Sequence, residues 1–208
     1  MKITVIGANG RTGKLIVEEA LAKGWQVVAY LRSKQKLPIV HANLTFVEGD
    51  AYNASQIGKA IEGADAVVSA LGQSDISGKV DLMSDGMKNI IPAMLQHHVK
   101  RVIAIGGMGA LQANANMLIK DLPDFPAEYK NVSEGHYKVF NLLQPTSLDW
   151  TFVCCPYIPD GAKTNNYQVR KDYLPNGKQQ IFTGDIAAFV VKELEQNQFL
   201  QTRVGISN

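Results

Sequence analysis

The sequence has few cysteines and no long uncharged apolar run, and these two absences exclude several classes of protein. Its only cysteines, Cys154 and Cys155, are adjacent among 208 residues, so they can neither cross-link a fold nor form a zinc site. The apolar stretch from Ile61 to Leu71 contains two acidic residues and is too short to span a bilayer. We therefore expect no disulfide scaffold, no metal site and no membrane protein.

An excess of charge of one sign is absent as well. The chain has 21 Lys+Arg against 19 Asp+Glu, a formal net charge of +2 at pH 7. This balance gives no electrostatic reason to expect nucleic acid or an anionic membrane as a partner. The first seven residues, MKITVIG, are typical of a buried strand and not of a signal peptide. The sequence therefore favours a cytoplasmic protein that forms one domain over residues 1–208.

Short apolar runs alternate with helical periodicities along the chain. Strands are expected at residues 3–6, 25–31, 44–47, 64–71, 99–105, 148–155 and 202–206. Helices are expected at residues 13–23, 54–61, 81–98, 127–143 and 184–196. Strands that are apolar throughout and alternate with helices predict an α/β fold, in which a doubly wound, mostly parallel sheet carries helices on both faces, Rossmann-like. Two irregular segments, 107–126 and 156–180, are predicted to form a small cap on the substrate side, with a hairpin near residues 175–177.

A glycine-rich turn follows the first strand and precedes the first helix. The segment Gly7-Ala8-Asn9-Gly10-Arg11-Thr12-Gly13 has the form G-x-x-G-x-x-G. Glycines permit a sharp turn and a close approach to a pyrophosphate, and the helix N-terminus offers free N–H groups to that anion. A glycine-rich turn without a ligand is the alternative. The position in a strand–turn–helix unit favours dinucleotide binding, with contacts from Gly7, Asn9, Gly10, Arg11, Thr12 and Gly13.

The end of the second strand lacks the acidic residue that reads the ribose 2′-hydroxyl of NAD. The segment Ala29–Lys36 carries Arg32 and Ser33 there, which can bind a 2′-phosphate by a forked, charge-assisted contact and a hydroxyl. Arg11 is expected to assist Arg32. A merely solvated basic loop is the alternative, and the pattern favours NADP(H) over NAD(H).

Taken together, these motifs resemble the atypical short-chain dehydrogenase/reductase superfamily. The similar branch contains the small NAD(P)H-binding proteins related to biliverdin-IXβ/flavin reductase and to NmrA-like proteins. The segments that carry this likeness are Gly7–Gly13, Gly49–Asp50, Ala64–Gly72, Ser84–Pro92, Trp150–Val153 and Thr183–Ala187, so it extends over essentially the full chain. Because the carboxyl ends of parallel strands face one cleft, further cofactor contacts are expected at Asp50, Ala51, Ala70, Leu71, Gly72, Gly106 and Gly107.

The sequence departs from the better-known branches of that superfamily at two positions. Tyr137, on the helix after the fifth strand, is followed four residues later by Asn141 and not by the lysine of a Tyr-x-x-x-Lys pair. The serine or threonine that often ends the fifth strand is replaced by Gly106–Gly107. Both losses disfavour the chemistry of alcohol dehydrogenases and sugar epimerases.

Two residues are candidates for the acceptor side of the site. The related flavin/biliverdin reductases also carry a histidine on the helix before the sixth strand, where this chain has His136. Tyr157 follows the sixth strand. His136 can donate a proton or bind a carboxylate, and Tyr157 can stack on an acceptor ring. Surface or packing roles are the alternatives for both.

Three functions therefore remain open. The leading one is an NADPH-dependent reductase of a conjugated acceptor such as a flavin or quinone, acting on a small molecule as a monomer or homodimer. A non-catalytic NADP(H)-binding sensor of the NmrA-like type would also keep the phosphate loop and lose the catalytic pair. A protein that resembles epimerases or dehydratases in fold alone is the third.

Overall fold

An eight-stranded sheet forms the centre of the computed structural model, which describes all 208 residues. The strands are β1 (Lys2–Ile6), β2 (Gln26–Leu31), β3 (Leu44–Glu48), β4 (Ala66–Ser69), β5 (Arg101–Gly107), β8 (Asp149–Cys155), β9 (Gln168–Lys171) and β10 (Thr202–Ser207). Their order is β3-β2-β1-β4-β5-β8-β10-β9. Every pairing is parallel except that of β9 with β10.

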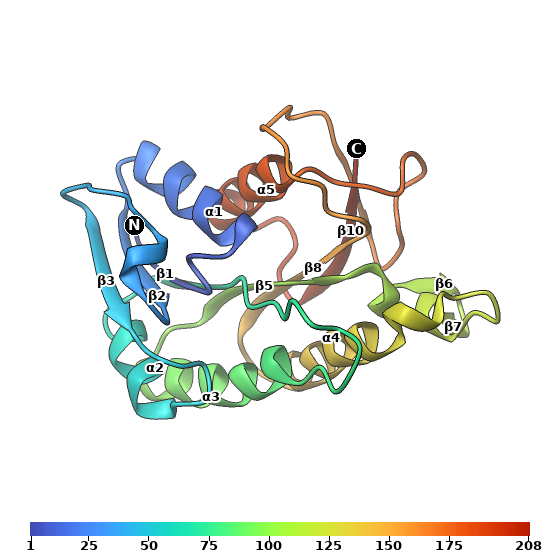
Figure 1. Cartoon of the computed structure of the whole chain (residues 1–208), viewed down its shortest axis with the longest axis horizontal. Helices are drawn as coiled ribbons and strands as arrows, with labels where there is room; N and C mark the ends of the chain where they lie inside the picture. The colour runs from blue at the N-terminus through green and yellow to red at the C-terminus, as the bar shows by residue number, and fades with distance from the viewer.

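Five α-helices cover the two faces of this sheet (Figure 1). Helices α1 (Arg11–Ala22) and α5 (Thr183–Gln196) pack together on one face, while α2 (Ala54–Ile61), α3 (Leu82–Gln96) and α4 (Lys130–Leu143) cover the other. This arrangement confirms the predicted doubly wound, Rossmann-like fold in a single domain.

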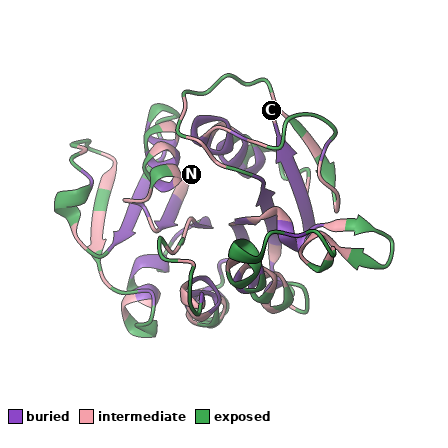
Figure 2. Ribbon diagram, turned by 45° about the vertical axis from the view of Figure 1, so that its right-hand side comes forward, coloured by how far each residue is buried: buried purple, intermediate pink, exposed green.

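Each face of the sheet has its own hydrophobic core, and the strands are buried between the two (Figure 2). Ile16 and Val190 from α1 and α5 belong to the first core, and Met87 and Ile90 from α3 belong to the second. Successive strand residues alternate between these cores, since side chains of a strand point to opposite faces. The near-continuous apolar strands of the sequence reflect this burial on both sides.

The connection between β5 and α4 has more structure than the sequence indicates. It contains a small antiparallel pair, β6 (Gln112–Asn114) with β7 (Met117–Leu118), and the 3₁₀ turns η2 (Met108–Ala110), η3 (Ile119–Asp121) and η4 (Ala127–Tyr129). The hairpin expected near residues 175–177 was wrong. The chain there forms only bends, because β9 pairs with the distant β10 and not with a neighbour in sequence.

The strand order reverses direction next to β1, and this reversal positions the candidate site. The chain runs outward through β2 and β3 on one side of β1 and then returns to β4 on its other side. In doubly wound sheets, a crevice for ligands opens at such a switch point, outside the carboxyl ends of the strands. No helix has the length and hydropathy that crossing a bilayer requires.

Candidate functional site

The glycines of the phosphate loop are required by the backbone contacts that they make. Gly7 has a φ of +85°, and a Cβ built there would lie 2.7 Å from the carbonyl oxygen of Ala70, at the end of β4. A Cβ on Gly13 would overlap the carbonyl oxygen of Gly7. Gly10 is less confined, since its Cβ would lie 3.2 Å from that same oxygen. The loop therefore presses against the end of β4 and leaves its open side at Gly10.

The first turn of α1 presents unpaired backbone donors. The N–H groups of Arg11, Thr12 and Gly13 donate to no acceptor within the protein, and the N-cap residue, Gly10, has no side chain to cap them. In α2, by contrast, the Asn53 side chain accepts the N–H of Gln56. No acidic side chain lies in the first turn of α1. This end of the helix can therefore accept an anion, and the residues fit a cofactor pyrophosphate.

Residues after β3 and β4 form the wall beside the phosphate loop. The hydroxyl of Tyr30 donates to the carbonyl of Asp50 at 2.8 Å, which fixes the turn after β3. Burial and then the nearby Asp50 carboxylate raise the pKa of Tyr30 to about 12, so it remains a neutral donor. Ala51 is buried, and Leu71 packs on α3 where Gly86 has no side chain. Ala70 and Gly72 flank Leu71 on the same segment.

The loop after β2 carries three cationic side chains, and none of them makes an ion pair. Arg32, Lys34 and Lys36 are exposed. An acidic residue that sequence reasoning missed lies beside them, since the Glu48 carboxylate accepts the backbone N–H of Lys34 at 2.7 Å. Glu48 is the last residue of β3 and pairs in register with Leu31, so only the parallel β2–β3 pairing could have located it. The loop therefore remains basic, with one carboxylate anchoring its backbone, and Ser33, the N-cap of the 3₁₀ turn η1 (Lys34–Lys36), is half-buried.

Arg11 contacts the loop after β8. Its guanidinium donates to the Asp160 carboxylate at 2.8 Å and to the carbonyl of Ile158 at 3.0 Å, both in that loop. β2, which precedes Arg32, and β8 lie on opposite sides of β1 in the sheet. The expectation that Arg11 assists Arg32 stays a prediction.

His136 packs against the carboxyl end of β5. A Cβ built on Gly107 would lie 2.7 Å from the imidazole Nδ1, so the ring occupies the space that a side chain at this strand end would fill. Burial lowers the pKa of His136 from 6.5 to about 4. The imidazole is therefore neutral near pH 7, and it can donate or accept one hydrogen bond but cannot serve as an imidazolium acid. Gly106, next to it, is similarly confined by the ring of Phe152.

Tyr157 lies at the same edge of the sheet. It follows β8 by two residues, and the last residue of β8, Cys155, pairs in register with Gly107. The tyrosine is 68% exposed and its hydroxyl makes no hydrogen bond within the protein, whereas its backbone carbonyl accepts the N–H of Ile181 at 2.9 Å. Its phenol is therefore free to meet a ligand, and a pocket shared with His136 stays a prediction.

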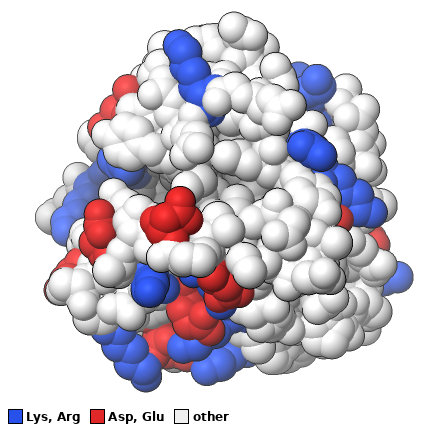
Figure 3. Space-filling model, turned by 90° about the vertical axis from the view of Figure 1, so that its right-hand side faces the viewer, with Lys and Arg blue, Asp and Glu red and all other residues white.

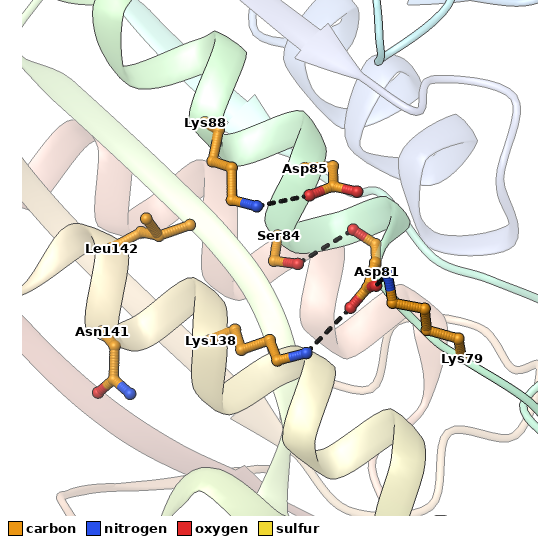
Figure 4. A pocket seen from close by; sticks show the side chains of 8 residues that line it. All are labelled: Lys79, Asp81, Ser84, Asp85, Lys88, Lys138, Asn141 and Leu142. Atoms are coloured by element: carbon orange, nitrogen blue, oxygen red, sulfur yellow. Dashed lines mark hydrogen bonds and ion pairs between the residues drawn. The ribbon is translucent and has the colours of Figure 1, made fainter.

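A polar cavity of about 410 Å³ lies where α3 faces α4 (Figure 4). Asp81 is bound there by both Lys79 and Lys138, and Asp85 pairs with Lys88 at 2.7 Å. Each lysine that lines this cavity thus has a carboxylate partner on the protein. Arg32, Lys34 and Lys36, which have no such partner, and the free N–H groups of α1 follow the carboxyl ends of β2 and β1, and this end of the sheet is the candidate site.

Comparison with known proteins shows the family of the chain. A family model described as NAD(P)H-binding matches residues 7–197, from the first glycine of the phosphate loop to the end of the last helix. The protein YwnB of Bacillus subtilis (strain 168) is 30% identical over 99% of this chain and 98% of its own length. The isoflavone reductase homolog A622 of Nicotiana tabacum is 23% identical, and the chain spans 60% of its length.

Several solved structures are similar to this chain over nearly its whole length. A protein of Streptococcus pneumoniae TIGR4, named "a putative NADH-flavin reductase", is 32% identical with a TM-score of 0.86, over 99% of this chain and 98% of its own. A protein of Burkholderia pseudomallei, named as an exported protein, is 29% identical with a TM-score of 0.86 over the full length of both chains. A short-chain dehydrogenase/reductase of Veillonella parvula, solved with NADP, is 18% identical with a TM-score of 0.76 and shares the fold.

Proposed function

Because the chain belongs to the NAD(P)H-binding family, we propose that it is an NADPH-dependent oxidoreductase that reduces a conjugated acceptor ring such as a flavin or quinone. The observation that carries this proposal is the pairing of two features at one sheet edge. These are a phosphate loop with three free N–H groups, and a strand end at Gly106–Gly107 that is bare of side chains and backed by a neutral histidine.

The nicotinamide would supply the hydride, so the protein must mainly bind, orient and shield the reactants. The N–H groups of Arg11, Thr12 and Gly13 would hold the pyrophosphate. Gly106 and Gly107 let the rings of Phe152 and His136 pack directly against the end of β5, which places the imidazole at this strand end. The neutral imidazole of His136 would orient the acceptor through a hydrogen bond. The chain lacks a Tyr-x-x-x-Lys pair on α4, and a flavin or quinone needs none because it can take its proton from water.

The relatives favour reduction of a ring over other chemistry. One similar structure has a name of the NADH-flavin reductase type, and several curated relatives are named isoflavone reductase homologs. The face of the molecule that carries β6 and β7 has a broad area without charged side chains (Figure 3), which is compatible with an acceptor of low charge.

Steady-state oxidation of NADPH with FMN, FAD and several quinones tests this function. Turnover with at least one of these acceptors is the expected result. A protein that binds NADPH tightly and oxidises it with none of them would instead be a sensor of the NADP(H) state, which is the second candidate.

The preference for NADPH depends on Arg32 and has its own test. A charge-assisted hydrogen bond contributes about 1.5–3 kcal/mol, so NADPH should bind roughly ten- to a hundredfold tighter than NADH. Arg32→Ala should remove most of this ratio, as measured from the two dissociation constants. Lys59→Ala, which removes one exposed positive charge on α2, is the matched control. Equal dissociation constants in the wild type would overturn the preference.

A further inference from the structure

The loop after β8 is anchored firmly at its far end. The backbone N–H groups of Thr164 and Asn165 donate to the buried Asp185 carboxylate at 2.8 and 2.7 Å, and the Thr164 hydroxyl donates to it at 2.7 Å. Asp185 belongs to the first turn of α5. Residues near 164 are thereby fixed to the body of the fold.

The near end of the same loop is held by backbone hydrogen bonds to residues 181–184, and one side chain joins it to the phosphate loop. Arg11 binds the carboxylate of Asp160 and the carbonyl of Ile158, at 2.8 and 3.0 Å. Both charged side chains are largely exposed, at 61% for Arg11 and 72% for Asp160. An exposed ion pair of this kind is weak and opens readily, unlike the buried anchor at Asp185.

The two partners follow strands that are not neighbours. Arg11 comes after β1 and Asp160 after β8, and β4 and β5 lie between these strands in the sheet. In the order of the sheet, the contact thus spans the positions of β4 and β5, whose carboxyl ends are followed by residues 70–72 and carry Gly106–Gly107. A dinucleotide with its pyrophosphate at the start of α1 and its nicotinamide near Gly107 would have to pass this contact.

We propose that Arg11 and Asp160 form a clasp that closes over the bound dinucleotide and slows its release. The inference rests on the proposed cofactor function and adds how that site retains its cofactor. Opening of the ion pair lets the cofactor enter. When the pair forms again, it reconnects the phosphate loop with the loop after β8. Asp160 thus acts by positioning the Arg11 side chain, without touching the reacting atoms.

A stopped-flow measurement tests the clasp through NADPH itself. NADPH bound to the full-length protein is displaced with excess NADP⁺, and the loss of its fluorescence gives the dissociation rate. Asp160→Asn should raise this rate about two- to fivefold, the size expected for an exposed ion pair. Arg11→Gln should do so too, and the double variant should release NADPH no faster than the faster single variant. The wild-type rate should rise toward that of Asp160→Asn at high salt, because salt screens exposed charges.

The chain offers a matched control in a second ion pair between the same two elements. Lys163, in the loop after β8, binds Glu19 of α1 at 2.8 Å, further along the helix from the phosphate loop. Lys163→Gln should leave NADPH release unchanged. Slower release or tighter binding in Asp160→Asn would overturn the clasp, since it would mean that Asp160 competes with the cofactor for Arg11. An unchanged rate in Asp160→Asn would overturn it too, whereas absence of NADPH binding to the wild type would overturn the proposed function with it.

Discussion

Two glycines of the phosphate loop have different physical roles, and substitution should separate them. Gly13 lies against the Gly7 carbonyl, so Gly13→Ala must move backbone and should lower the free energy of unfolding by about 1–3 kcal/mol. Gly10 borders the open side of the phosphate loop, where an added side chain would clash with the ligand more severely than with the protein. Gly10→Val should therefore retain a cooperative thermal transition and lose NADPH binding. Calorimetry with and without NADPH measures both effects, and retained NADPH affinity in Gly10→Val would show that the loop is only structural.

The neutral state of His136 predicts how activity depends on pH. The folded pKa of about 4 lies below the ordinary 6.5, so the unfolded chain binds the proton more readily. The contribution of this group to stability is thus complete above about pH 6.5 and is lost as the pH falls toward 4. A titration of the imidazole by NMR should show no change of charge near 6.5, and turnover should show no limb there. A midpoint near 6.5 would contradict this burial.

Substitutions of His136 and Tyr157 should separate effects on acceptor binding from effects on turnover. His136→Ala should slow turnover by less than the roughly 10²–10⁴-fold typical of a lost proton donor, because water can protonate the acceptor. Tyr157→Ala should raise the KM for the acceptor. NADPH affinity should change little in either variant, and a large loss of it would move these residues to the cofactor side.

At single residues, the sequence predicted local features and missed partners that are distant in the chain. The glycine spacing located the phosphate loop because strand, turn and helix are contiguous there. The contact of Arg11 with Asp160 was not foreseen, because the two residues are 149 positions apart and no local pattern indicates their pairing. Glu48 was missed since only the register of β2 with β3 brings it beside Lys34.

Among the elements, α5 is unusual because its buried first turn holds other segments in place. The Asp185 carboxylate accepts hydrogen bonds from Thr164, Asn165 and the Asn208 side chain. Burial alone would raise the pKa of Asp185, but these hydrogen bonds outweigh it and lower the pKa below its usual value. A depressed folded pKa means that the stabilisation is present above about pH 4 and is lost as the pH falls through the folded value.

Asp185→Asn should therefore lower the free energy of unfolding at pH 7 by about 1–3 kcal/mol. It should also flatten the decline in stability between about pH 5 and pH 3. Urea unfolding at several pH values measures both, with Asp124→Asn, at an exposed carboxylate without an ion pair, as the control. An undiminished decline in the Asp185 variant would assign the acid sensitivity to other groups.

Helices and strands were predictable where the hydrophobic periodicity of the sequence matches the burial of the residues in the structure. The helix at 54–61 and the apolar strands follow directly from the pattern, because both faces of the sheet are covered. The β6–β7 pair was not foreseen, since strands of three and two residues are too short to show a period. The false hairpin at 175–177 came from turn residues whose neighbouring strand, β9, pairs elsewhere.

At the scale of the whole molecule, the carboxyl ends and the amino ends of the strands have different roles; they are called here the carboxyl edge and the opposite edge of the sheet. The carboxyl edge carries open donors and free cations, which suit a ligand. The opposite edge carries a closed polar network, in which Arg101 at the start of β5 binds Glu193 of α5 at 2.9 Å and the Thr151 hydroxyl at 2.9 Å. Glu193 also accepts the backbone N–H of Phe199 at 2.9 Å, so strands, helix and turn meet at one buried charge pair.

This separation predicts that stability can be lost without loss of cofactor affinity. Glu193→Gln leaves the Arg101 guanidinium buried beside a neutral partner, and breaking a buried pair costs about 3–5 kcal/mol. For a chain of this size, the midpoint of thermal unfolding should fall by roughly 10 °C. The NADPH dissociation constant, measured at a temperature where the variant is folded, should stay within about twofold of the wild type. Lys23→Gln, which breaks the exposed pair with Glu195 on the same helix, should change neither quantity. A matching loss of affinity in Glu193→Gln would mean that the two edges are coupled through β5 and α5.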